Sequence, residues 1–259
     1  MFDWLPNLPV VWIGLVVLVG MALLTAVIYA VVMRLAEGDR AAALKAISPG
    51  MLPPMGILFA LFVGFLAVGV WGNVDRAEEA VNTEASALRA VVLLSDDLPA
   101  TDRTRMRALI RRQIQTAVDE EWPAMEDQRA SLTAIPAPLS DALHLAFALR
   151  PREEGEAVSQ REIVASIQDA LDARRQRIIV SESGINAVKW LGLVALAALT
   201  LVTAALIHTG NRTSARIAIA VFTVAEAVVI TMLVAQDQPF TGQLGLTPDV
   251  LEQVFPRVS

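Results

Sequence analysis

The stretch MLPPMGILFALFVGFLAVGVWGNV, Met51–Val74, contains no charged side chain. Three further apolar runs occur at Val10–Met33, Trp190–Ile207 and Ile217–Ala235, and only the last of them holds a charge, Glu226. A run of about 18 or more apolar residues is long enough to cross the hydrocarbon core of a bilayer as a helix. The sequence therefore predicts an all-α membrane protein with four transmembrane helices, arranged as two plus two around a charged insert.

The positions of these runs predict four consecutive parts. They are a first transmembrane helix pair (residues 1–74), a water-exposed helical bundle next to the membrane (75–187), a second transmembrane helix pair (188–236) and a C-terminal tail (237–259). No proline occurs between Met55 and Leu98, and apolar residues keep a helical period past the end of the second run. We therefore expect one continuous helix to run from the membrane into the bundle.

The composition bounds the function. A hydrophobic fraction of 55% exceeds the usual share in soluble domains, and a net charge of −6 argues against a nucleic-acid partner. The chain has no cysteine, which excludes disulfides and thiolate metal sites. Its only histidines, His144 and His208, lie in different regions, and we find no phosphate loop or nucleophile motif. We expect no enzyme activity, no catalytic or metal site and no cofactor.

The insert has the pattern of several amphipathic helices. Pro99 ends the long second helix, and Thr101 or Asp102 is a suitable cap for the next one, whose apolar face ends at Trp122. We expect Trp122 to be at least half buried. A shorter helix over residues 139–149, a polar link over 151–159 and a last helix ending at Gly184 complete the predicted bundle, and Asn186 is a suitable cap for the third span.

The clustered arginines of the insert have two interpretations. Arg103, Arg105, Arg107, Arg111 and Arg112 form one group, and Arg174, Arg175 and Arg177 form another. Such groups attract anions or acidic lipid. Acidic residues lie close to both groups in the sequence, so a solvated helical face with salt bridges is the interpretation that we favour.

The positive charges near the span ends bear on which side of the membrane the insert lies. The predicted short loops carry Arg34, Arg40, Lys45, Arg212 and Arg216, which the positive-inside rule places in the cytoplasm. An even number of spans separates each terminus from the insert, so both termini and the insert share one side, and this count places them outside. The arginines of the insert near the span ends favour the opposite orientation, and both stay open.

Four local strings resemble the bacterial bestrophin-like domain family of unknown function. They are VWGNVDRAEEAVNTEASALRAV (Val70–Val91), EEWPAM (Glu120–Met125), ARRQRIIVSESG (Ala173–Gly184) and DQPFTGQLGLTPDVLEQV (Asp237–Val254). The resemblance covers nearly the whole chain and implies a multi-pass protein of the bacterial plasma (inner) membrane. It also implies a distant relation to bestrophins, which are pentameric anion channels with four-span subunits and a helical cytosolic part. That relation would place the insert in the cytoplasm.

The second run carries the candidate pore neck. Leu58, Phe62 and Leu66 lie at i, i+4 and i+8, on one face of a helix. If this helix lined the axis of an oligomer, the three side chains would form a hydrophobic constriction. The resemblance implies the same, because bestrophins have an apolar neck on the corresponding helix. Ordinary contact with lipid or with another helix is the alternative, and the glycines of this run suit close helix approach.

Further candidates are Glu226, the pair Asn73 and Asp75, and the segment Asp237–Phe240. An acid at bilayer depth costs about 2.5–3.5 kcal/mol on insertion scales, so Glu226 should face protein or water. It is either an ion-pathway carboxylate or a protonated acid hydrogen-bonded to a neighbouring helix, with Thr223 one turn earlier and Thr200 or Thr203 as candidate partners. Asn73 and Asp75 close the second span, either as a pore mouth or as a helix end at the interface. The segment Asp237–Phe240 follows the fourth span. We favour a structural turn there, which folds the tail against the membrane face and lets Phe240 pack on the bundle, and a ligand site is the alternative.

Two functions stay open from the sequence. The first is a ring-shaped homo-oligomer, with a pentamer as the first choice, in which the second spans surround a narrow path for an inorganic anion. Four spans with few polar residues cannot line a wide aqueous path within one subunit, so any path must lie between subunits. The second is a non-conducting, membrane-anchored scaffold or sensor whose helical insert binds a protein partner. In both, the lipid bilayer is the first partner.

Overall fold

The computed structural model describes most of the chain. The described residues are 8–36, 49–132, 135–151 and 153–255. Within those ranges the regular elements are all helices, which confirms the predicted fold class. The chain divides into two compact units, which we call the membrane unit (Met1–Gly72 with Gly184–Asp237) and the bundle unit (Asn73–Ser183 with Gln238–Ser259).

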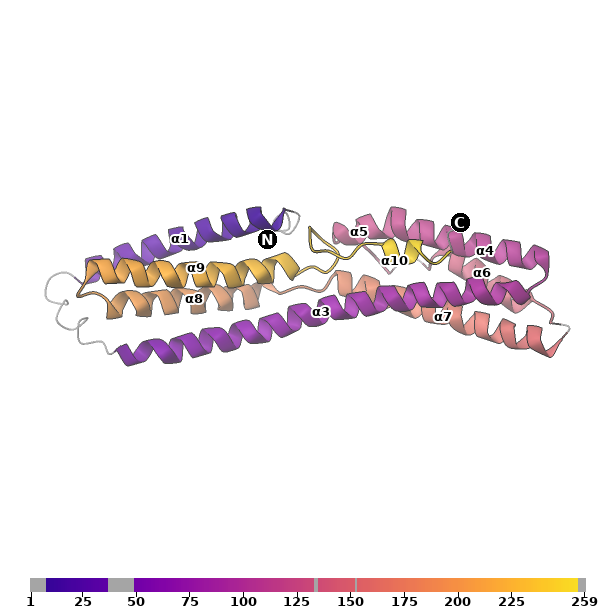
Figure 1. The fold of residues 1–259 in the computed structure, drawn as a ribbon, viewed down its shortest axis with the longest axis horizontal. Helices are drawn as coiled ribbons and strands as arrows, with labels where there is room; N and C mark the ends of the chain where they lie inside the picture. Colours follow the sequence, from indigo (N-terminus) through magenta and orange to yellow (C-terminus); the bar gives the residue numbers. More distant parts are fainter. Residues whose placement is uncertain (1–7, 37–48, 133–134, 152, 256–259) are drawn as a thin grey trace. The chain divides into compact units, whose positions relative to one another are not determined.

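The membrane unit contains helices long and apolar enough to cross a bilayer. They are α1 (Val10–Leu35), the first part of α3 (Leu52–Leu94), α8 (Ala187–Ile207) and α9 (Arg212–Gln236), seen in Figure 1. Four spans were expected, and four helices of this kind are found among the described residues. The protein is therefore a membrane protein.

Helix α3 is the longest element, and it belongs to both units. It is continuous over 43 residues, from Leu52 to Leu94, with no interruption at the Trp71–Asp75 segment. At a rise of 1.5 Å per residue, such a helix is roughly 65 Å long, about twice the thickness of the hydrocarbon core. The expectation of one helix running from the membrane segment into the insert is confirmed.

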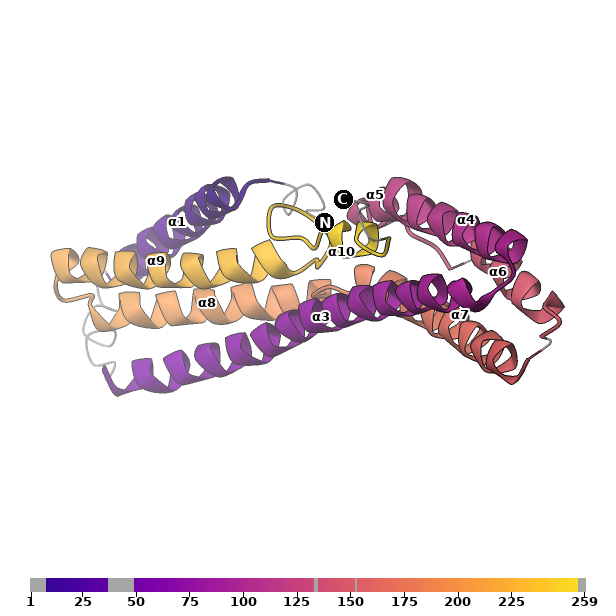
Figure 2. The ribbon, with the colours of Figure 1, turned by 45° about the vertical axis from the view of Figure 1, so that its right-hand side comes forward.

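Helices α1 and α9 pack against each other in antiparallel register. A Cβ built at Gly14 would lie 3.5 Å from Thr231 Cγ2, and the hydroxyls of Thr25 and Thr223 are 2.7 Å apart. Small residues and hydroxyl pairs of this kind allow close helix approach inside a membrane. The C-terminal end of α1 thus meets the N-terminal end of α9, as Figure 2 shows.

Asparagines define the starts of the last two spans. The side chain of Asn186 accepts a hydrogen bond from the backbone N–H of Lys189, and that of Asn211 accepts from Thr213 and Ser214. These bonds satisfy N–H groups that have no partner within the helix. The expected cap at Asn186 is confirmed.

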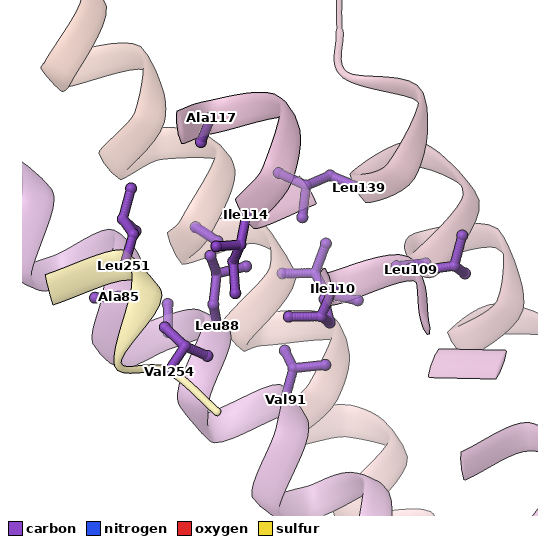
Figure 3. Packing of buried hydrophobic residues seen from close by; sticks show 14 of the residues in the cluster. Ala85, Leu88, Val91, Leu109, Ile110, Ile114, Ala117, Leu139, Leu251 and Val254 are labelled. Atoms are coloured by element: carbon purple, nitrogen blue, oxygen red, sulfur yellow. The ribbon is translucent and has the colours of Figure 1, made fainter. Parts of the chain in front are cut away.

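The bundle unit packs several helices around one apolar core. The helices are the second part of α3, η3 (Ser95–Asp97), α4 (Ala100–Thr116), the π-helical turn η4 (Ala117–Glu121), α5 (Trp122–Glu126), α6 (Ala137–Ala148), α7 (Glu154–Ser181) and α10 (Asp249–Glu252). Figure 3 shows Leu88 and Val91 of α3 near Ile110 and Ile114 of α4. The predicted insert bundle is found, and Trp122 is 3% exposed, which confirms its expected burial.

Three local expectations for the insert are wrong. Helix α4 begins at Ala100 with Pro99 in the N-cap position, so Thr101 and Asp102 lie inside the first turn and neither side chain caps the helix. The predicted polar link over 151–159 is mostly helix, since α7 begins at Glu154. Acidic residues in a first turn favour a helix start through its dipole. Helix α7 also ends at Ser181, before Gly184.

The tail after α9 folds onto the bundle unit, and this is the turn that the sequence favoured over a ligand site. Phe240 is buried, and its ring meets that of Trp122 edge-on, with centroids 5.3 Å apart. The turn depends on Gly245, where an added Cβ would lie 2.9 Å from the backbone of Phe240 and Thr241. Figure 3 shows Leu251 and Val254 of the tail beside Ala85 of α3.

The sidedness of the membrane stays a prediction. The positive-inside count uses the charges of both chain ends and of the first short loop, which includes Arg40 and Lys45. Residues 1–7, 37–48 and 256–259 lie outside the described residues.

Candidate functional site

The membrane part of α3 is the least covered of the spans. In its most apolar window 11% of residues are buried within the chain, against 39% for α8. Since the helices are similarly apolar, this difference reflects packing rather than composition. Most of this segment of α3 is therefore available to lipid or to another copy of the chain.

The predicted neck residues do not share one environment. Leu66 is 6% exposed and packs in the core of the membrane unit. Phe62 lies against α8, because a Cβ added at Gly192 would lie 3.0 Å from Phe62 Cζ. Leu58 is exposed. Two of the three residues thus contact their own subunit, and the pore neck itself stays a prediction.

A different stripe of α3 is exposed. Leu61 and Phe65 lie four residues apart, Val68 follows three residues later, and all three are exposed, Phe65 at 69%. Gly64 lies beside them, and no atom is found within 4 Å of a Cβ built there. A bare glycine flanked by large apolar side chains is a surface on which another helix packs closely.

Glu226 lies inside the membrane unit, as expected from its cost in lipid. It is 2% exposed, and neither carboxyl oxygen has a hydrogen-bond partner among the described residues. The threonines proposed as partners, Thr200, Thr203 and Thr223, donate to backbone carbonyls four residues earlier in their own helices. Glu226 is therefore a buried acid in a group of helices whose other buried polar side chains are threonines.

Asn73 and Asp75 occupy the first turn of α3 that belongs to the bundle unit. Asn73 accepts a hydrogen bond from Arg76 at 2.6 Å, and Asp75 is exposed. This local bond fits a solvated helix segment, and the pore-mouth assignment stays a prediction.

Asp237 follows α9 and connects it to the segment before α8. Its carboxylate accepts a hydrogen bond of 2.7 Å from the backbone N–H of Ile185, and a Cβ at Gly184 would lie 3.5 Å from its Oδ2. Burial raises the pKa of Asp237 from 3.8 to about 6, although the Ile185 bond and the charge of Lys189 oppose this rise.

The raised pKa of Asp237 predicts a pH effect on stability. The folded state holds the proton more tightly than the unfolded state, so stability falls as pH rises from about 4 through about 6. Asp237→Asn keeps an acceptor for Ile185 and does not titrate, so its apparent Tm should lack this fall. The difference in Tm between the two proteins, followed from pH 4 to 7 in detergent, measures the effect; parallel curves would contradict it.

The bundle unit contains a buried cluster of charges at its centre. Arg177 of α7 is 0% exposed and donates from Nε and Nη2 to Glu84 of α3, at 2.7 and 3.2 Å. Its Nη2 also donates to Glu121 at 2.7 Å, and Arg174 donates to the other oxygen of Glu121. The guanidinium carbon of Arg177 lies 5.6 Å from the centroid of the Trp122 ring.

This charge cluster is electrically balanced. Burial by itself lowers the pKa of Arg177, but the carboxylates of Glu84 and Glu121 raise it above its ordinary value, so the guanidinium stays charged. Burial raises the pKa of Glu84, and the charge of Arg177 opposes that rise. With two arginines against two glutamates, the ionised cluster has no net charge to offer a ligand. We therefore assign the cluster to the structure of the bundle unit.

Sequence reasoning placed Arg174 and Arg177 on a solvated helical face with salt bridges. The salt bridges are found, but the solvated position is wrong, since both arginines are buried. A signal was present. Ile163, Ile167 and Ala170 lie at spacings of four and three residues, and Arg174 and Arg177 continue the same spacing along one face of α7. Arg175, outside this stripe, is exposed as expected.

Metal chemistry has no visible support in these sites. Among the described residues, no group of three or more histidine and acidic side chains could hold a metal ion.

Comparison with known families adds one decisive finding. The model of the Bestrophin-like domain matches residues 9–251. The chain belongs to this family. No curated protein and no solved structure shows a significant match.

The Bestrophin-like domain includes both units of the chain. Its match begins one residue before α1 and ends within α10, so the spans, the insert and most of the described tail form one family domain. The resemblance inferred from the sequence is confirmed. The packed tail up to Leu251 is thus a part of the Bestrophin-like domain rather than an addition to it.

Proposed function

We propose that this membrane protein forms a homo-oligomeric ring around α3 and conducts inorganic anions between its subunits, without enzymatic chemistry. The observation that carries the proposal is the exposed stripe of Leu61, Phe65 and Val68 beside the bare Gly64. Family membership supports the channel class, and a pentamer is the expected ring size.

The interior of one membrane unit is unsuited to an ion path. The hydroxyls of Thr200, Thr203 and Thr231 donate to carbonyls of their own helices, and the surrounding core residues are apolar. Within the described residues of α1, α8, α9 and the part of α3 up to Gly72, Glu226 is the one acidic side chain. An ion inside such a helix group would lose its hydration without replacement ligands, which costs many kcal/mol. The surface between copies is the better place for a path.

The geometry changes the residues that we propose for the neck. Phe62 and Leu66 contact their own subunit, so the exposed Leu61, Phe65 and Val68 are better placed to face an axis. An apolar ring formed by these side chains would oppose ion passage by excluding water. Glu226 keeps a role within the subunit, in the packing of α9.

Phe65→Ala is expected to raise chloride flux several-fold in liposomes, because it removes the widest side chain of the stripe. Phe62→Ala is the matched control, since it deletes the same ring from the face packed on Gly192. It should lower the apparent Tm and leave flux per folded ring unchanged. Glu226→Leu is a third variant to test. It should shift the apparent Tm and leave the flux per folded ring close to that of the wild type.

Three outcomes would contradict parts of this proposal. Cross-linking or native mass measurement that gives only monomers would exclude the ring. A gain of flux in Phe62→Ala but not in Phe65→Ala would restore the neck of Leu58, Phe62 and Leu66. A ring without flux in any variant would favour the scaffold or sensor.

A further inference from the structure

We propose that the end of the membrane unit formed by the C-terminus of α1 and the N-terminus of α9 binds the head group of an anionic phospholipid. Arg34, Arg216 and Tyr29 are the residues that would hold its phosphate. This inference is independent of ion conduction.

The packing of α1 on α9 places these residues at one end. The guanidinium Nε of Arg216 donates to the Tyr29 hydroxyl at 3.3 Å, and its carbon lies 5.9 Å from the centroid of the Tyr29 ring. Arg34 lies five residues after Tyr29 on α1, which is roughly 7.5 Å further along the axis. In the antiparallel register of the two helices, this brings it level with the first turn of α9, where Arg212 adds a further positive charge.

The depth of these residues suits a lipid head group. About 20 helical residues span the hydrocarbon core, so a span that ends at Gln236 reaches the opposite interface near Arg216. Arg34 lies in the last turn of α1, and tyrosine favours the same level of the bilayer. Both arginines are exposed.

The local charge is positive. Among the described residues of this end, residues 31–36, 49–51 and 208–216, there is no aspartate or glutamate. The sequence of residues 37–48 adds two acids, Glu37 and Asp39, and two bases, Arg40 and Lys45, and so no net charge. The opposite end of the membrane unit differs, because it carries Asp237.

The chemistry of the site matches a phosphate diester. The guanidinium of arginine offers planar pairs of N–H donors that suit phosphate oxygens. For Arg216 the bond to Tyr29 uses Nε, and no other hydrogen bond or ion pair is found among the described residues, so the terminal amino groups can serve a ligand. The Tyr29 contact holds the guanidinium in one place before binding.

The surroundings favour a lipid over a free anion. Val31, Leu35 and Ile217 flank the charged residues, and all three are exposed. Acyl chains attached to the phosphate would cover these side chains, whereas a free phosphate ion would leave them uncovered. Each arginine at the interface raises the affinity for anionic lipid about fivefold.

The test is the binding of phosphatidylglycerol to the full-length protein in detergent, titrated by native mass spectrometry with phosphatidylcholine as the reference lipid. The wild type should bind phosphatidylglycerol preferentially. Arg34→Gln with Arg216→Gln should weaken this binding by about 25-fold, at fivefold per arginine. Arg34→Lys with Arg216→Lys should keep part of it, since the charge remains and the planar donors do not. Tyr29→Phe should weaken it less than the double glutamine variant.

A matched control removes two charges elsewhere. Arg161 and Arg175 are exposed arginines of α7 in the bundle unit, and Arg161→Gln with Arg175→Gln should bind phosphatidylglycerol as the wild type does. Equal losses in both double variants would mean general charge attraction and would overturn the site. Inorganic phosphate that displaces the bound lipid at equal concentration would overturn the lipid assignment in favour of a free anion. Unchanged binding in the Arg34→Gln, Arg216→Gln variant would overturn the proposal altogether.

Discussion

Replacing Arg177 by methionine is expected to lower the free energy of unfolding of the bundle unit by about 3–5 kcal/mol. Among the described residues, Arg177 is the one cation in an ion pair with Glu84, and Glu84 is itself 0% exposed. A buried carboxylate without its partner must lose its charge or draw in water, and either event costs free energy. Unfolding in denaturant, followed by tryptophan fluorescence of the full-length protein in detergent, measures the loss.

Arg175→Met is the matched control for Arg177→Met. Arg175 lies two residues earlier on α7, is exposed, and should tolerate the change within about 0.5 kcal/mol. Adding Glu84→Leu to Arg177→Met should recover part of the stability, because the buried carboxylate that lost its partner is then removed, while Glu121 keeps its ion pair with Arg174. Equal stability of Arg177→Met and Arg175→Met would show that the charge cluster contributes nothing.

The second large effect is expected at Trp122, whose replacement by alanine should cost about 3–5 kcal/mol. The ring packs edge-on against Phe240, and its N–H donates to the carbonyl of Leu246 at 3.3 Å. Both partners lie in the tail, so the variant should also release the tail from the bundle unit. Limited proteolysis after Phe240 measures that release, beside the denaturant midpoint.

Phe147→Ala is the control for Trp122→Ala, since Phe147 is an exposed aromatic residue of α6. It should change neither the midpoint nor the cleavage of the tail. The losses at Trp122 and Arg177 should not add, because the guanidinium of Arg177 lies over the Trp122 ring. A Trp122→Ala protein whose tail resists proteolysis as well as the wild type would contradict the assigned packing.

The order and approximate extent of the helices were predictable from the sequence, because they depend on the lengths of the apolar runs and on the positions of prolines and helix caps. The absence of proline between Met55 and Leu98 predicted continuous α3, and Asn186 marked the start of α8. The start of α7 was missed because its acidic first turn, at Glu154 and Glu156, is as polar as a linker. Such residues favour a helix through its dipole rather than through an apolar face.

The candidate site was less predictable, for a physical reason. In a span that is apolar all round, no periodic signal separates the face that packs on α8 from the face that remains exposed. Phe62 and Phe65 are therefore equivalent in the sequence and different in the structure. At Glu226 the reverse holds, because a lone acid in an apolar run must avoid lipid, and inward placement followed from its type alone.

The π-helical turn Ala117–Glu121 makes the fold of the insert sensitive to the loss of a single residue at this point. Such a turn holds one residue more than an α-helical turn. Loss of one residue there would restore the tighter winding and rotate the following segment by about 100°. Glu121 would then leave Arg174 and Arg177, and Trp122 would leave Phe240. Insertions and deletions are usually tolerated in surface loops. In this helical segment, by contrast, the number of residues determines which side chains face the core.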